Sequence, residues 1–336
     1  MTEAAKKKMS KAKKILIAVV AIVLALLVVV DIAVSGYLVN YAIGRAGDGG
    51  DRNVEEVVIE AEGTEASIEA ERAAQVQEAA EFLNAVPGES VGITAADGVH
   101  LACIVYEHDD TDNRWALVIH GYRSSHESDS VLDMARHYYD AGFNVLTPDL
   151  RASGQSEGDY VGMGWLDRLD ILDWGDWILT QDADAQIVIH GVSMGAATTM
   201  MVAGEETPDA VVAFVEVCGY TSVWDVFSSE LSRRFGLPEF PLLYSASALS
   251  GVMAGYSFEE ASALEAVARS EKPMLFIHGT ADDFIPFDMM GQLYDAKATG
   301  DKEMLVSEGA GHGEAMYELG DAYWDTVLGF VNRHVG

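Results

Sequence analysis

The sequence has few cysteines and no pattern of metal ligands. Its 336 residues include only Cys103 and Cys218, each within an apolar segment typical of a strand. Two cysteines cannot build the disulfide framework of a small secreted domain, so we expect two buried free thiols. The sequence contains no Cys-x-x-Cys pattern and no cluster of histidines, and it therefore predicts no metal and no cofactor.

The sequence is also short of positive charge. It contains 21 lysine and arginine residues against 54 aspartate and glutamate residues, which gives a formal net charge of −33. Six lysines lie within residues 1–34, and the rest of the chain carries 15 basic residues against 52 acidic ones. Such a surface repels nucleic acid and anionic lipid headgroups, so we expect no nucleic-acid partner.

One long apolar run lies near the N-terminus. Residues 15–30 are apolar without interruption, and residues 32–34 extend the run past Asp31. About 20 such residues are enough to cross the hydrocarbon core of a bilayer as a helix. Because six lysines precede the run and none follows it closely, the positive-inside rule puts residues 1–14 in the cytoplasm. We expect a single-pass anchor at residues 15–34, with the rest of the chain outside the cell membrane.

A cleaved signal peptide is the alternative interpretation of the same run. Ala33, Val34 and Ser35 form a passable small-residue cleavage site, and cleavage there would secrete the protein. The run is longer than the roughly 7–15 apolar residues usual in a signal peptide, which favours the uncleaved anchor.

Residues 35–70 are predicted to be a flexible acidic linker. A glycine-rich stretch at 44–50 precedes a segment rich in Glu and Ala, and part of it, residues 70–83, has the composition of a helix. We place the folded domain at residues 71–336 and find no internal repeat in it.

From residue 90 onwards, short apolar segments alternate with helical ones. Strands that are apolar throughout and alternate with helices are typical of a parallel sheet covered on both faces, which predicts an α/β fold. The turn dipeptide Asp97-Gly98 predicts a hairpin between the first two strands. The predicted strands are 90–95, 100–106, 115–119, 143–147, 186–189, 210–217, 274–277 and 304–306; the predicted helices are 129–141, 164–179, 196–202, 258–268 and 321–333.

Ser193 is the predicted nucleophile. It is the centre of Gly191-Val192-Ser193-Met194-Gly195, which follows a predicted strand and precedes a helix of small residues. A serine that must rise clear of the sheet on a sharp strand-to-helix turn needs glycine neighbours, because larger side chains would clash. The helix N-terminus beneath it also favours developing negative charge.

A serine nucleophile needs a base, for which His312 is the candidate. His312 lies in a glycine-rich loop after the last predicted strand, and it comes last in the chain order Ser, acid, His. His190 and His278 stand at strand ends before a glycine and are predicted to be packed, while His120 also lies near the site.

The base in turn needs a carboxylate that fixes its tautomer. Asp282 and Asp283 follow the predicted strand 274–277, and Glu216 ends the strand before it. We choose Asp282 as the acid.

Two backbone amides are predicted to stabilise the oxyanion. The residue after the nucleophile, Met194, supplies one amide. The other comes from the loop after strand 115–119, where His120-Gly121-Tyr122 offers the amide of Tyr122.

Together these motifs resemble the α/β-hydrolase superfamily, and more narrowly the bacterial membrane-anchored hydrolases grouped with serine aminopeptidases and monoglyceride lipases. The resemblance covers about residues 80–335. In that group the Asp four residues after the His of a His-Gly pair is the triad acid, which implies Asp282 after His278. Residues 149–156 match the group's Asp-x-Arg-Gly-x-Gly-x-Ser loop, except that Ala152 replaces a glycine, and Arg151 is expected to organise the loop through an ion pair.

More than fifty residues lie between the strands 210–217 and 274–277, where one crossover helix would suffice. Their aromatic content predicts a small helical cap at about 221–257; an ordinary decorated crossover with aromatic core residues is the alternative. A cap would line an apolar acyl pocket, so we expect short or medium acyl esters to be hydrolysed better than peptides.

The resulting prediction is a serine hydrolase that cleaves an ester, or an amide, through an acyl-enzyme. Two alternatives stay open. An aminopeptidase would need an acidic receptor for the substrate amine, for which Glu230 and Glu239 are present but expected on the surface. A non-catalytic membrane-anchored binding protein would be expected to have lost Ser, His or the acid, and all three are present.

Overall fold

The central sheet positions everything that follows. The computed structural model describes residues 10–45, 65–108 and 113–336, and among these eight strands form one sheet in the order β1-β2-β4-β3-β5-β6-β7-β8. β2 is antiparallel to both of its neighbours, β1 and β4, and from β4 to β8 each neighbouring pair is parallel. The strands are β1 Glu89–Thr94, β2 His100–Tyr106, β3 Arg114–Ile119, β4 Asn144–Pro148, β5 Gln186–Val192, β6 Val211–Val217, β7 Met274–Gly279 and β8 Lys302–Ser307.

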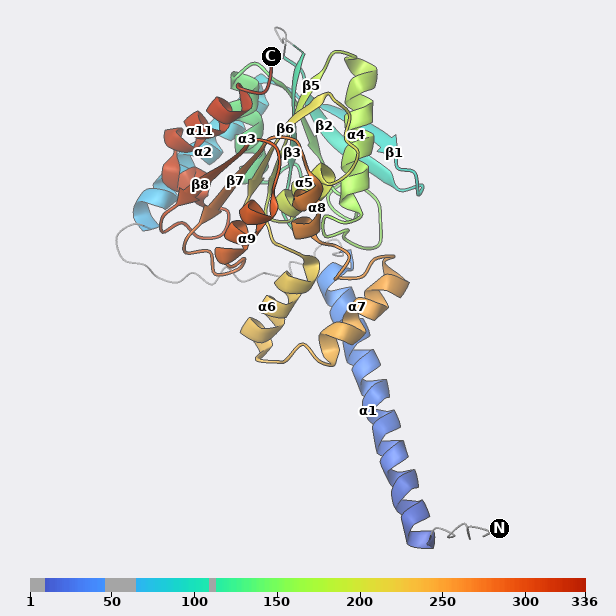
Figure 1. Cartoon of the computed structure of the whole chain (residues 1–336). Helices are drawn as coiled ribbons and strands as arrows, with labels where there is room; N and C mark the ends of the chain where they lie inside the picture. The colour runs from blue at the N-terminus through green and yellow to red at the C-terminus, as the bar shows by residue number, and fades with distance from the viewer. Residues whose placement is uncertain (1–9, 46–64, 109–112) are drawn as a thin grey trace.

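Helices cover both faces of the sheet (Figure 1). On one face α2, α3, α10 and α11 share a buried cluster that includes Tyr138 and Phe330. On the other face α4, α5, α8 and α9 share a second cluster that includes Trp174 and Met200. The helices are α2 Glu65–Ala85, α3 Asp129–Asp140, α4 Asp167–Gln181, α5 Met194–Ala203, α8 Ala263–Arg269, α9 Asp288–Ala296, α10 Ala315–Leu319 and α11 Asp321–Val331. The mostly parallel sheet covered on both faces confirms the α/β fold predicted from the strand and helix rhythm, and it is the α/β-hydrolase fold that the resemblance of the motifs implied.

Two further helices form the predicted cap. α6 Val223–Phe235 and α7 Leu242–Met253 lie below the carboxyl ends of the parallel strands, outside the two covering layers (Figure 1). The return to the sheet begins later than predicted, at α8, because the Ser262 hydroxyl caps that helix by accepting a hydrogen bond from the Glu265 amide.

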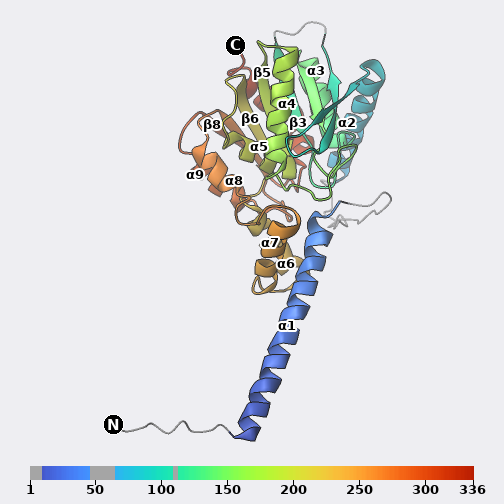
Figure 2. The same cartoon turned by 90° about the vertical axis from the view of Figure 1, so that its right-hand side faces the viewer.

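The apolar N-terminal run is part of one long helix, α1 Lys11–Ile43. Figure 2 shows it as a shaft that leaves the cap and projects far from the sheet. It is the one helix in the described part of the chain that is long and apolar enough to cross a membrane, and both an anchor and a signal sequence meet that criterion.

The predicted linker is helical at both of its ends. α1 continues through residue 43 because Ser35, Val39 and Ile43 are buried against the folded domain, and α2 already begins at Glu65. The prediction that the flexible linker begins at residue 35 is therefore wrong, because residues 35–43 are helical. The middle of the predicted linker, residues 46–64, lies outside the described residues, as do residues 1–9 of the predicted basic tail.

Candidate active site

Ser193 occupies the turn between β5 and α5. Its backbone has φ 57° and ψ −118°, a conformation that a non-glycine residue rarely adopts. A Cβ on Gly191 would lie 2.1 Å from the Gly195 carbonyl oxygen, and a Cβ on Gly195 would lie 2.3 Å from the Ile119 carbonyl oxygen. The two glycines are therefore required by close backbone approach, and they allow the strained turn that presents Ser193.

Ser193, His312 and Asp282 form a continuous hydrogen-bonded row. The Ser193 Oγ lies 2.8 Å from His312 Nε2, and His312 Nδ1 lies 2.7 Å from Asp282 Oδ2. The three residues come from the loops after β5, β7 and β8, so the parallel sheet brings together side chains that are up to 119 positions apart in the sequence. The geometry suits a nucleophile, a base and an orienting carboxylate.

Backbone amides hold the Asp282 carboxylate in place. Its Oδ1 accepts hydrogen bonds from the amides of Phe284 at 2.9 Å and Ile285 at 2.8 Å. Its Oδ2 lies 3.1 Å from Nε2 of the buried His278 as well as close to His312. The carboxylate is thus fixed from two sides while one oxygen faces the base.

The other two candidate carboxylates lie elsewhere. Asp283 is exposed. Glu216 is buried, and its Oε2 accepts a hydrogen bond from the Gly219 amide at 3.0 Å. Burial raises the pKa of Glu216 to about 7, so this side chain is partly protonated at neutral pH.

The acid and the base have opposite pKa shifts. Burial by itself raises the pKa of Asp282, but hydrogen bonds from His278 and His312 outweigh burial and hold this pKa well below its ordinary value. Burial lowers the pKa of His312, but the neighbouring Cys218 sulfur and the Asp282 carboxylate outweigh it and hold this pKa well above 6.5. Asp282 is therefore ionised at neutral pH and favours the imidazolium that forms when the base takes a proton.

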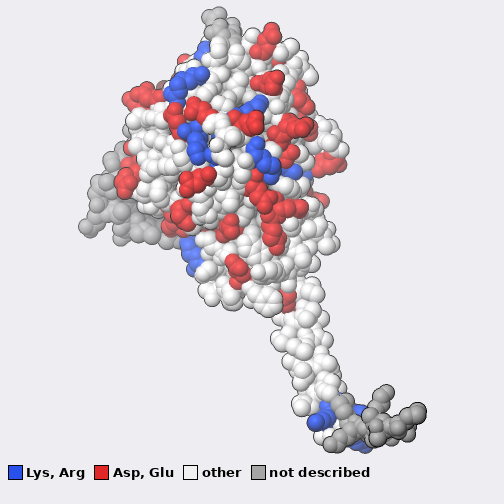
Figure 3. Space-filling view, in the orientation of Figure 1, with Lys and Arg blue, Asp and Glu red and all other residues white. Residues whose placement is uncertain are grey.

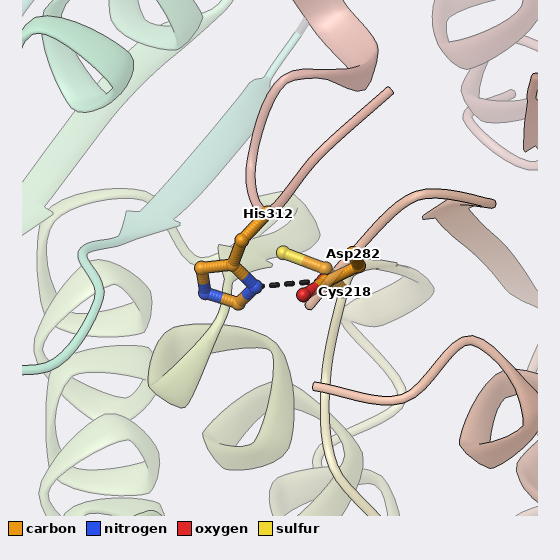
Figure 4. A group of neighbouring side chains, drawn as sticks. All are labelled: Cys218, Asp282 and His312. Atoms are coloured by element: carbon orange, nitrogen blue, oxygen red, sulfur yellow. Dashed lines mark hydrogen bonds and ion pairs between the residues drawn. The ribbon is translucent and has the colours of Figure 1, made fainter. Parts of the chain in front are cut away.

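Cys218 is a neighbour of the base that the sequence analysis did not place there. It follows β6 with φ 49° and is buried as a free thiol, as is Cys103. Figure 4 shows its sulfur beside the hydrogen bond between His312 and Asp282. One atom each of Cys218, Asp282 and His312 lies within 4.8 Å of the others, a set of ligand types that could hold a metal ion. Only the strained backbone after β6, which the sequence does not reveal, turns the thiol toward the base.

The remaining histidines near the strand ends are held by packing. His120 Nε2 accepts a hydrogen bond from the Leu150 amide at 3.0 Å. His190 lies between the hydroxyls of Tyr138 and Tyr323, and burial lowers its pKa to about 3. These contacts give both imidazoles structural partners.

The loop after β3 lies directly against the nucleophile. A Cβ on Gly121 would be 3.5 Å from the Ser193 Cβ, which places the adjoining Tyr122 segment beside the reacting hydroxyl. Met194 is buried at the first position of α5. The two predicted oxyanion amides thus belong to segments that flank Ser193.

The same loop is tied to the end of α1. The Tyr122 hydroxyl donates a hydrogen bond to the Ala42 carbonyl, and the Arg123 guanidinium donates one to the Tyr41 carbonyl. These carbonyls belong to the last turn of the helix, where backbone carbonyls generally have no intrahelical donor. The helix that the sequence marks only as an anchor is therefore a direct support of the loop beside Ser193.

The Arg151 loop also has a structural role. Arg151 donates hydrogen bonds to the Asp170 carboxylate at 2.6 and 2.7 Å and to Asp97 at 2.9 Å. Ala152, which stands where the resemblance leads us to expect glycine, has φ 59°, the left-handed region that favours glycine. The loop-organising ion pair predicted for Arg151 is confirmed.

An apolar pocket begins at Ser193. Its walls come from three sources: the loops around the nucleophile, the cap helices, and the last turns of α1. The residues that line it are Leu38, Val39, Tyr41, Ala42, Tyr122, Arg123, Met163, Ser193, Met194, Tyr220, Val226, Phe227, Glu230, Leu231, Arg234, Phe235, Leu242, Leu243, Ala246, Phe258 and Phe284. Glu230 is the one carboxylate among them, and it forms ion pairs with Arg233 and Arg234.

Comparison with known proteins gives one family match. The profile of the prolyl oligopeptidase family matches residues 132–336, a segment that contains Ser193, Asp282 and His312. Among curated proteins, the uncharacterized protein YqkD of Bacillus subtilis is 30% identical over 197 residues, which cover 58% of this chain and 64% of YqkD. The match thus spans somewhat less than two thirds of that relative.

Solved structures share the fold at low identity. An esterase of Pyrococcus furiosus, Pf2001, superposes with a TM-score of 0.62 and 21% identity, over 75% of this chain and 93% of the esterase. The acylaminoacyl peptidase of Pyrococcus horikoshii superposes with a TM-score of 0.56 and 17% identity, over 74% of this chain and 42% of the peptidase. One fold therefore accompanies both an esterase and a peptidase, and the choice between them has to come from the pocket.

Proposed function

The chain belongs to the prolyl oligopeptidase family and is a serine hydrolase; from this premise we propose that it cleaves carboxylic esters through a triad of Ser193, His312 and Asp282. The observation that carries the proposal is the hydrogen-bonded row, with 2.8 Å between Ser193 Oγ and His312 Nε2 and 2.7 Å between His312 Nδ1 and Asp282 Oδ2. A dead hydrolase fold would not be expected to keep all three groups aligned.

The reaction follows from the roles of these groups. His312 Nε2 takes the proton of Ser193 as Oγ forms a bond to the carbonyl carbon of the ester, and the amides of Tyr122 and Met194 donate hydrogen bonds to the oxyanion. The carbon–oxygen bond to the alcohol then breaks, and His312 gives its proton to the departing alcohol. Water next attacks the acyl-enzyme as His312 takes its proton. The bond between the acyl carbon and Ser193 Oγ then breaks, His312 returns the proton to Oγ, and the carboxylic acid leaves.

The pocket favours an ester with an apolar acyl group over a peptide. Its lining is predominantly apolar and aromatic, and Glu230, the carboxylate that could receive a substrate amine, is already engaged by two arginines. A peptidase activity is the second candidate, because Glu230 does lie in the pocket rather than on the open surface expected from the sequence.

A panel of p-nitrophenyl esters beside aminoacyl anilides with a free amine separates the two activities. We expect kcat/KM to be higher for the esters than for the anilides. We also expect Glu230→Gln to leave the ratio of these two kcat/KM values unchanged. Higher kcat/KM for the anilides, lost in Glu230→Gln, would replace the esterase proposal with an aminopeptidase.

We also propose that α1 anchors the protein with the catalytic domain outside the cytoplasm. Lys11, Lys13 and Lys14 begin the helix, and no lysine follows the apolar run closely. Figure 3 shows a shaft that is white over most of its length, with basic side chains at its far end and an acidic side chain near the folded domain, over which further acidic side chains are scattered.

A cysteine at the exposed edge strand β8 tests this orientation. Cys103 and Cys218 are buried, so Met304→Cys supplies an accessible thiol at a position that is 43% exposed. A membrane-impermeant maleimide added to intact cells is expected to label it. Labelling that requires cell lysis would put the domain in the cytoplasm instead.

A further inference from the structure

One wall of the pocket is made by the membrane-anchoring helix itself. Leu38, Val39, Tyr41 and Ala42, in the last turns of α1, line the same pocket as Ser193. The opposite wall comes from α6 and α7 of the cap, so the space above the nucleophile lies between the cap and α1. Both cartoon views place α6 and α7 beside the upper part of α1 (Figures 1 and 2).

Hydrogen bonds between α1 and α7 fix the depth of the cap relative to the apolar run. The Ser35 hydroxyl donates to the Leu242 carbonyl at 3.3 Å, and the Ser245 hydroxyl donates to the Asp31 carboxylate at 2.5 Å. Asp31 lies three residues before the run ends at residue 34, which is about 5 Å along a helix axis. If residues 15–34 cross the hydrocarbon core, the first turn of α7 lies at the level of the lipid headgroups and the outermost acyl carbons.

This pairing also accounts for the one charge in the apolar run. An aspartate that faced lipid would be costly, whereas Asp31 accepts a hydrogen bond from the cap. The cap is therefore packed against a part of α1 that the sequence assigns to the membrane.

The cap exposes apolar side chains on the surface that would meet the bilayer. Phe240, next to the start of α7, is 73% exposed, and Tyr244, in its first turn, is 51% exposed. Exposed aromatic and aliphatic side chains beside an apolar helix are typical of a membrane-interaction surface. The exposed large hydrophobic residues of the cap are Phe235, Leu237, Phe240, Tyr244 and Val252.

The charges of the molecule favour a neutral lipid over an anionic one. Beyond residue 34 the chain carries 52 acidic residues against 15 basic ones, which repels anionic headgroups. In the pocket lining Arg234 is paired with Glu230, and Arg123 is the one further charged side chain, so the lining carries a single net positive charge against the strongly acidic surroundings.

Resting on the proposed esterase function, we infer that the substrate is a neutral ester of a long-chain acyl group that enters from the bilayer between α1 and α6, because α7 is packed against α1. The acyl chain lies against Leu38 and Val39 of the anchor, and the ester carbonyl reaches Ser193. The anchor is thus part of the acyl-binding wall as well as the attachment to the membrane, and the chain length goes beyond the short or medium acyl groups expected from the sequence.

The first test uses the full-length protein in phosphatidylcholine vesicles with two esters of the same leaving group. We compare p-nitrophenyl palmitate in the vesicles with p-nitrophenyl acetate in the surrounding water. Leu38→Trp places a larger side chain in the pocket wall and is expected to lower the palmitate-to-acetate rate ratio at least tenfold. Tyr37→Trp is the matched control, because Tyr37 is exposed and does not line the pocket; its ratio is expected to stay within twofold of wild type.

The second test measures contact with lipid and needs no enzyme activity. Phe240→Cys carries an environment-sensitive fluorophore in the cap, and Met304→Cys carries it on β8 as the control. We expect spin-labelled phosphatidylcholine to quench the label at position 240 and not the label at position 304. Equal quenching at both positions, or no change in the ester ratio of Leu38→Trp, would overturn the inference.

The two tests also separate this inference from the proposed function. Loss of p-nitrophenyl acetate hydrolysis in Ser193→Ala supports the triad whatever happens to the palmitate ratio. If wild type hydrolyses acetate but position 240 is not quenched, the enzyme proposal stands and entry from the bilayer is wrong.

Discussion

Two unlike regions meet at Ser193. The catalytic side is a row of polar groups on loops after the parallel strands, each held by hydrogen bonds of 2.7–3.1 Å. The pocket side is apolar and comes from α6, α7 and α1, whose buried residues continue the apolar cluster under α4, α5, α8 and α9. A change on the catalytic side is expected to alter the hydrolysis rates of all esters by the same factor. A change in the pocket wall is expected to alter the ratio of the rates for long and short esters.

The largest effect is expected from the nucleophile. Ser193→Ala removes the atom that forms the acyl-enzyme, and the rate is expected to fall by about a million-fold on short and long esters alike. Rates on p-nitrophenyl acetate and palmitate, with circular dichroism to confirm folding, check this prediction. A folded Ser193→Ala protein that loses only one of the two activities would break the separation between the two sides.

The next effect is expected from the acid. Asp282→Asn leaves His312 without a carboxylate at Nδ1 and is expected to lower kcat about 10⁴-fold, again equally for both esters. Asp283→Asn and Glu216→Gln are the matched controls, because neither carboxylate is hydrogen-bonded to His312 in the structure. A milder effect of Asp282→Asn than of either control would mean that another carboxylate orients the base.

The pH dependence of kcat/KM sharpens the same assignment. The base acts as neutral imidazole, and its pKa in the folded protein is raised, so activity is expected to rise with pH and to reach half its plateau above pH 6.5. Removing the negative charge in Asp282→Asn lowers this pKa, and the acidic limb is expected to move to lower pH even though the plateau falls. If the acidic limb of the pH profile stays at the same pH in Asp282→Asn, Asp282 does not face the titrating base.

The smallest effect is expected where the two regions touch. Tyr122→Phe keeps the backbone amide proposed for the oxyanion but removes the hydroxyl that donates to the Ala42 carbonyl of α1. A net hydrogen bond of about 1 kcal/mol corresponds to roughly a fivefold loss of rate. Initial rates on both esters check this prediction, and a loss above a hundredfold would mean that the hydroxyl itself takes part in the chemistry.

The catalytic side could be predicted from the sequence more completely than the pocket side. Residues 191–195 mark the nucleophile turn in the sequence, and the strand rhythm explains why loops far apart in the chain meet at one edge of the sheet. The strand rhythm thus predicts that Ser193, Asp282 and His312 lie at this edge, whereas the preference for Asp282 over Asp283 and Glu216 is supported by the family resemblance. The helical cap followed from the length of its insertion.

The pocket wall could not be predicted in the same way. An apolar run predicts a membrane-spanning helix, but it does not show which residues the end of that helix contacts. The continuation of α1 through Ile43 and its contacts with Tyr122 and Arg123 depend on tertiary packing, which the sequence does not reveal. The position of Cys218 depends on a backbone of positive φ that no glycine marks.

The central claim, that Ser193 is the activated nucleophile, is tested most directly by labelling with a fluorophosphonate. The intact protein is treated with the probe, digested, and the modified residue is identified by mass spectrometry. A single adduct on Ser193, absent in Ser193→Ala and strongly reduced in His312→Ala, is the predicted result. No adduct on the folded wild-type protein, or an adduct on another residue that persists in Ser193→Ala, would contradict the account.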